Sequence, residues 1–121
     1  MPLYDLLKKR LGEAEKYIKE DSKVRNVLKM VGKIKVNVKT NDTNEHVGAS
    51  IGSDGVEIFR KAIDDPAITI SGDSKILTGL VTSPSRAKFD EAQQKEQVKI
   101  ESHGLKGRLA VSKVKDLLSQ G

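Results

Sequence analysis

The feature that most constrains the fold is the regular alternation of apolar and polar residues over 33–40. Ile34, Val36 and Val38 alternate there with lysine and asparagine. Successive side chains of a β-strand point to opposite faces of the sheet, so this strand has one apolar face and one wet face. The apolar face must be buried against something else. We therefore expect a sheet that helices cover on one side.

The next segments predict two more strands joined by short turns. Residues 41–44 (Asn-Asp-Thr-Asn) have the composition of a turn. A second strand is predicted at 45–52 and, after a turn at 52–55, residues 56–63 are predicted to form a third strand or a short helix. Strands joined by short turns pair antiparallel, because parallel pairs need long crossovers. The sequence thus predicts an antiparallel meander.

Residues 65–81 change their periodicity in the middle. Ile68 and Ile70 alternate with smaller residues as in a strand, whereas four later apolar residues recur at helical spacing. These four are Ile76, Leu77, Leu80 and Val81. Asp73 or Ser74 can cap the helix, since a short side-chain oxygen reaches the free N–H groups of the first turn. Our hypothesis is that this helix roofs an apolar ligand site.

Two helical patterns precede the sheet, within an N-terminal segment at 1–31. An amphipathic stripe of leucine, alanine and isoleucine predicts a helix from about 3 to 19. Asp21 or Ser22 can cap a second helix, which Gly32 would end. The pattern leaves open whether these are two helices or one kinked helix.

The C-terminal third is less regular. Ser83 and Pro84 predict the start of a segment that runs to about 97, either a helix or a mobile lid loop, with Phe89 on its apolar side. A strand is expected from Val98, then a tight bend or bulge over 103–108, then a C-terminal helix. The predicted fold is α+β: a mostly antiparallel sheet of about five strands covered on one face by helices.

Composition limits the class of protein. The length of 121 residues fits a single domain, with the sheet-and-helix body at 33–118. The chain has no Cys, which excludes disulfides and thiolate metal sites, and its two His are too few for a His-rich metal site. No apolar run approaches the roughly 20 residues that span a bilayer. The first ten residues place their charge after the apolar residues, the reverse of a secretory signal. We expect a soluble, cytoplasmic protein.

The net charge of +5 is unevenly distributed. The first 40 residues hold 11 Lys or Arg and 5 Asp or Glu. Such a surplus attracts nucleic acid or anionic lipid headgroups, although a solvated helix face with mixed charges explains it more simply. Two Phe, two Tyr and no Trp offer few stacking platforms, which disfavours nucleic acid as a partner. A weak contact with an anionic membrane surface stays open.

One short motif has the composition of an anion-binding loop. Residues 104–108 (Gly-Leu-Lys-Gly-Arg) place Lys106 and Arg108 beside two glycines, whose backbone N–H groups can approach a phosphate. The spacing matches neither of the common nucleotide-binding motifs. Glycines that permit a sharp bend between strands are the favoured explanation. His46 and His103 belong to no recognisable catalytic motif, so we expect no enzyme, no catalytic residue and no cofactor.

The layout nevertheless resembles a known family, the sterol carrier protein type-2 domain. The resemblance covers roughly residues 30 to 118 and rests on two stretches: Ala67–Val81, a strand followed by a helix with paired apolar positions, and Val98–Ala110, with its basic–apolar alternation and glycines. It implies a five-stranded sheet with an apolar tunnel that binds fatty acids, acyl-CoA or sterol-like lipids, and no covalent chemistry.

The resemblance also assigns residues to the tunnel. From the helix and the segment after it come Ile76, Leu77, Leu80, Val81 and Phe89; from the sheet come Ile68, Ile70, Ile100 and Leu109. Lys106 and Arg108 would hold a headgroup near the mouth. The longer, charged segment at 82–97 departs from the family pattern. The absence of the peroxisomal C-terminal tripeptide of many eukaryotic members suggests a prokaryotic protein. The alternative hypothesis is a basic interaction module, for nucleic acid or a protein partner, with a fully packed core.

Overall fold

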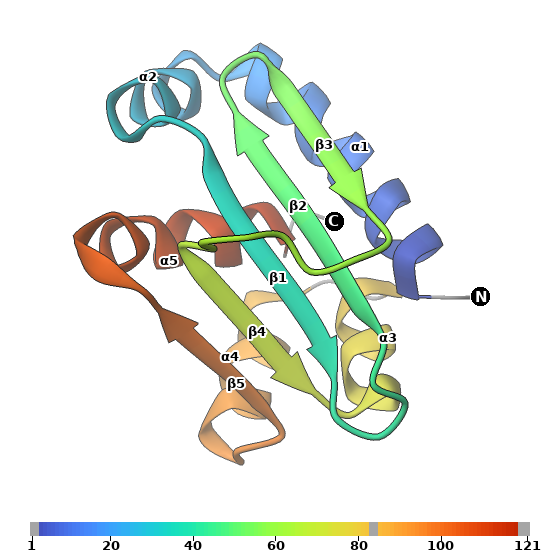
Figure 1. Ribbon diagram of the computed structural model, residues 1–121. Helices are drawn as coiled ribbons and strands as arrows, with labels where there is room; N and C mark the ends of the chain where they lie inside the picture. Colours follow the sequence, from blue (N-terminus) through green and yellow to red (C-terminus); the bar gives the residue numbers. More distant parts are fainter. Residues whose placement is uncertain (1–2, 83–84, 119–121) are drawn as a thin grey trace.

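A computed structural model describes residues 3–82 and 85–118 as one twisted sheet with helices packed on it (Figure 1). The strands are β1 (Ile34–Thr40), β2 (His46–Gly52), β3 (Gly55–Phe59), β4 (Ile68–Gly72) and β5 (Val98–Ser102). The helices are α1 (Leu3–Glu20), α2 (Ser22–Val31), α3 (Ser74–Thr82), α4 (Arg86–Gln94) and α5 (Gly104–Leu118). The predicted α+β class is confirmed.

The sheet has the strand order β3-β2-β1-β4-β5. β1, β2 and β3 form the predicted antiparallel meander, with the third segment a strand and not a helix. β5 pairs antiparallel with β4, whereas β4 runs parallel to β1. A parallel neighbour requires a crossover, and the chain makes it between β3 and β4.

This crossover lies across the sheet face opposite the helices (Figure 1). The Asn37 side chain fixes it, since its amide donates to the Ile63 carbonyl and its oxygen accepts from the Ile63 N–H, both at 2.9 Å. A Cβ on Gly48 would lie 2.7 Å from the Lys61 carbonyl oxygen. Glycine at 48 therefore lets the crossover rest directly on the sheet.

The other sheet face forms the core with the helices. Ile34, Val36 and Val38 are buried as the alternation predicts. The α1 stripe is buried as well; it consists of Leu3, Leu7, Leu11, Ala14 and Ile18. α1 and α2 are separate helices, because Asp21 caps α2 by accepting hydrogen bonds from the N–H groups of Lys23 and Val24.

The start of α3 is tied to the β1–β2 turn. Asp42 in that turn accepts hydrogen bonds from the Ser74 hydroxyl at 2.6 Å and the Ser74 N–H at 2.9 Å. These two bonds lower the pKa of Asp42 to about 2. At the other end of α3, the Arg10 side chain donates to the Val81 carbonyl, which joins α1 to α3.

Within the segment predicted at 83–97, residues Arg86–Gln94 form the helix α4. Ser85 is the N-cap of α4 and accepts from the Lys88 N–H. The cap predicted at Ser83 and Pro84 falls outside the described residues.

The prediction of a tight bend or bulge at 103–108 is wrong, because the chain passes there from β5 into α5. Gly104 has a positive φ of 73°, and α5 begins at it. One face of α5, with Gly107, Ala110 and Val114, is buried against the sheet. Leu105 and Leu109 lie on the opposite face and are 72% and 61% exposed.

Candidate ligand site

Two small apolar cavities lie between the helices and the sheet. The first, which we call the α3 cavity, has a volume of about 20 Å³ and is lined by Leu7, Val38, Ile70, Leu77, Leu80, Val81 and Phe89. The second, the α5 cavity, has a volume of about 10 Å³ and is lined by Leu7, Leu11, Val36, Val38, Val47, Ala49, Ile51 and Val114. Leu7 and Val38 belong to both walls, so the cavities are neighbours separated by side chains.

The elements around the α3 cavity explain its apolar character. β1 and β4 provide its floor, since Val38 and Ile70 point to the helix side and are partners in the parallel register. α3 presents Leu77 and Leu80 one turn apart, and both are buried. Phe89 closes the cavity from α4. Among the residues that the structure describes, no polar side chain lines this wall.

α4 is held over the cavity by a polar contact with α5. The Lys115 ammonium lies 2.6 Å from the Asp90 carboxylate and donates to the Gln93 side chain at 2.9 Å. It also lies 6.0 Å from the centre of the Phe89 ring. The hydrogen bond from Lys115 lowers the pKa of Asp90. This contact thus ties α4, the helix that carries Phe89, to α5.

The structure brings five of the predicted lining residues together at the α3 cavity: Ile70, Leu77, Leu80, Val81 and Phe89. Ile68 is fully buried in the core and lines neither cavity. Ile100 is half-buried on β5, opposite Ile70. Ile76 is half-buried and faces an open surface hollow beside Asp42 and Gln97.

The remaining predicted residues lie elsewhere. Leu109, expected on the sheet, is on α5 and points to solvent, because the strand ends at Ser102 and the helix begins at Gly104. Lys106 and Arg108 are also exposed on α5. The Lys106 ammonium lies 3.5 Å from the position that a Cβ on Gly32 would occupy. It is therefore beside the end of α2 and away from the α3 cavity.

The sequence hypothesis missed the contribution of α1. Leu7 lines both cavities and Leu11 lines the α5 cavity. The apolar stripe at 3–18 identified this helix face as buried, but the family resemblance began near residue 30. Periodicity alone indicates which face of α1 is buried and not which element it faces.

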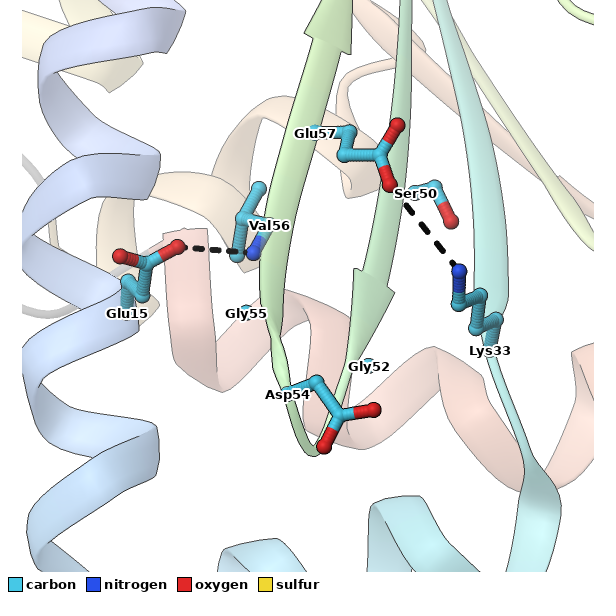
Figure 2. A pocket seen from close by; sticks show the side chains of 8 residues that line it. All are labelled: Glu15, Lys33, Ser50, Gly52, Asp54, Gly55, Val56 and Glu57. Atoms are coloured by element: carbon cyan, nitrogen blue, oxygen red, sulfur yellow. Dashed lines mark hydrogen bonds and ion pairs between the residues drawn. The ribbon is translucent and has the colours of Figure 1, made fainter.

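A polar hollow of about 170 Å³ opens at the β2–β3 turn (Figure 2). The Glu15 carboxylate accepts from the Val56 N–H at 2.9 Å, and Lys33 lies 4.0 Å from Glu57 (Figure 2). β3 is an edge strand, and Glu15 satisfies a backbone donor that this edge would otherwise expose. The hollow is thus explained by the attachment of α1 to the sheet. Across residues 3–82 and 85–118, no group of three or more His, Asp or Glu is placed to hold a metal ion.

Solved structures with the same architecture identify the fold. A protein described as UbiJ-SCP2, a ubiquinone synthesis protein, superposes with a TM-score of 0.66 over 97% of this chain and 99% of its own, at 10% identity. This is the sterol carrier protein type-2 fold. The palmitated SCP2L2 of Aedes aegypti gives a TM-score of 0.65 at 12% identity, covering 99% of this chain and 96% of its own.

A third match has the same fold. The sterol carrier protein domain 2 of Helicoverpa armigera superposes with a TM-score of 0.60 at 11% identity, covering 94% of this chain and 88% of its own. No family model matches the sequence, and no curated protein matches it either. Of the helices in the described residues, none has the length and apolar character to cross a bilayer.

Proposed function

We propose that this protein is a non-enzymatic lipid carrier that holds an acyl chain or a similar apolar ligand between α1, α3, α4 and the sheet. The observation that carries the proposal is the α3 cavity, an unfilled apolar space at the centre of a sterol carrier protein type-2 fold. The palmitated SCP2L2 of Aedes aegypti, which has this fold, supports an acyl chain as the ligand.

The cavity volumes define what binding requires. A water molecule needs about 10–15 Å³ of such space, and an engineered cavity of about 150 Å³ holds benzene. The two cavities, at about 20 and 10 Å³, are therefore closed to an acyl chain in this conformation. Binding must join them by moving Leu7 and must displace a helix. α4 is the candidate for this movement, because only two of its side chains, Phe89 and Ala92, are buried. Its polar contact with Lys115 would have to break when it moves.

The driving force is burial of methylene groups, each worth about 0.8 kcal/mol. This contribution to the binding free energy needs no charged group on the protein. Stabilisation then grows with ligand concentration as RT ln(1 + [L]/Kd), so palmitate should raise the melting temperature of delipidated protein. Native mass spectrometry should show a one-to-one complex.

A cavity-filling variant distinguishes internal binding from surface adsorption. Val38→Ile adds one methylene at the wall shared by both cavities, which should raise the stability of the free protein and weaken palmitate binding about fourfold. Val98→Ile is the matched control: Val98 is buried on β5 and lines neither cavity. It should leave the palmitate Kd unchanged. Equal effects of both variants on the Kd, or no complex with the wild type, would refute internal binding.

A further inference from the structure

The exposed large apolar side chains of the described residues lie on two helices, α2 and α5. Met30 is 86% exposed, Leu105 72% and Leu109 61%. Met30 lies in the last turn of α2, and the two leucines are four residues apart on α5, hence on one face of that helix. The proposed ligand cavity uses none of the three.

The end of α2 lies close to the start of α5. The Lys106 ammonium in the first turn of α5 lies 3.5 Å from the Cβ position of Gly32, which directly follows α2. In the view of Figure 1, α5 lies below α2. Met30 is two residues before Gly32, and Leu105 directly precedes Lys106, so this contact brings the end of α2 that carries Met30 towards the start of α5 that carries the leucines.

The sequence segments that contain these residues are rich in positive charge. Residues 22–41 contain six Lys or Arg and no Asp or Glu, and residues 102–115 contain four Lys or Arg and no Asp or Glu. Lys29, Lys106 and Arg108 are exposed, and the structure gives them no ion pair within the described part of the chain. Lys33, by contrast, is paired with Glu57 at 4.0 Å.

We propose that these six residues form a docking surface for an anionic lipid bilayer. The α2–α5 patch consists of Met30, Leu105 and Leu109 with Lys29, Lys106 and Arg108. Apolar side chains on an amphipathic helix enter the boundary between headgroups and acyl chains, while flanking Lys and Arg attract anionic headgroups. The patch combines both requirements.

Other partners fit the patch less well. A nucleic acid would use the positive charge but would leave three large apolar side chains without a purpose, and the patch has no aromatic residue on which a base can stack. A second copy of the chain would bring two positive patches together. The anionic bilayer is the partner that uses both the charge and the apolar side chains.

Vesicle flotation with the full-length chain tests the proposal. The protein should float with vesicles of phosphatidylcholine containing about one third phosphatidylserine and should not float with phosphatidylcholine alone. Each Lys or Arg near an anionic surface contributes a factor of about five, so Lys106→Gln with Arg108→Gln should lower binding about 25-fold. Leu105→Ser with Leu109→Ser should lower it at least tenfold.

The matched control removes the same charge from another helix. Lys9→Gln with Lys16→Gln changes two exposed lysines of α1 and should retain most of the wild-type binding. Thermal unfolding shows whether each variant is folded. The palmitate Kd should be the same in all the variants, so a loss of vesicle binding is distinguished from a loss of palmitate binding. Equal losses from the control and the α5 pairs would overturn the proposal. So would binding to single-stranded RNA without binding to vesicles.

Discussion

Replacement of Gly107 by alanine tests most sharply how α5 packs on the sheet. A Cβ at this position would lie less than 3.0 Å from the Ala67 carbonyl oxygen and 3.2 Å from its carbonyl carbon. That oxygen already accepts the His103 N–H at 2.8 Å. Relief of the clash must therefore move α5 away from β4 and strain this hydrogen bond.

The expected cost follows from these contacts. Overpacking a well-packed site costs about 1–3 kcal/mol, and a weakened hydrogen bond about 0.5–1.5 kcal/mol. Alanine recovers about 0.5–1 kcal/mol of helix propensity. Gly107→Ala should thus lower the free energy of unfolding by about 0.5–4 kcal/mol.

Gly79→Ala provides the comparison, since it makes the same chemical change in α3 where a Cβ would meet nothing within 4 Å. It should raise the free energy of unfolding by about 0.5–1 kcal/mol. Urea denaturation followed by circular dichroism measures both. Equal stabilities of the two variants would refute the close approach of Gly107 to Ala67. They would then favour the bend predicted from the sequence at 103–108 over a packed helix.

Three further predictions concern the polar contacts that position the elements. Asn37→Ala leaves the Ile63 N–H and carbonyl without partners and should cost about 1–3 kcal/mol; hydrogen exchange of the Ile63 amide should accelerate, and an unchanged rate would contradict the clamp. The Ser74 hydroxyl and N–H hold the pKa of Asp42 at about 2, so Asp42 stabilises the fold above its unfolded pKa near 4 and loses this effect as the pH falls towards 2. The difference in melting temperature between wild type and Asp42→Ala should be constant above pH 5 and shrink between pH 4 and 2; a difference independent of pH would exclude this role. Asp90→Asn removes the carboxylate that faces Lys115 and should increase hydrogen exchange in α4 more than in α3, whereas equal changes would show that α4 is not held by this pair.

The strands and most helices could be predicted because their patterns are local. The alternation at 33–40 and the change of period at 68–81 each depend on a few neighbouring residues, and β1, β4 and α3 follow them closely. Asp21 and Asp73 are caps of the expected type. The antiparallel meander followed from turn length alone.

The errors arise where long-range packing decides the structure. The glycines at 104 and 107 indicated a bend, but only the distance between Gly107 and Ala67 shows that a helix packs there. Leu109 consequently points to solvent. The parallel pairing of β1 with β4 depends on the crossover and on the clamp by Asn37, 26 residues from Ile63. Leu7 and Val38, which line both cavities, come from segments far apart in the sequence. The periodicity of either segment does not predict that they line the same cavities.

The central claim, that an acyl chain binds between the helices and the sheet, is tested most directly by locating the ligand. Carbon-13-labelled palmitate added to delipidated protein should give intermolecular nuclear Overhauser effects to methyl and ring protons of Leu7, Val38, Leu77, Leu80 and Phe89. The exposed methyl groups of Leu105 and Leu109 serve as the internal control and should give none. Contacts confined to Leu105 and Leu109, or no intermolecular contacts at saturating palmitate, would contradict an internal lipid site.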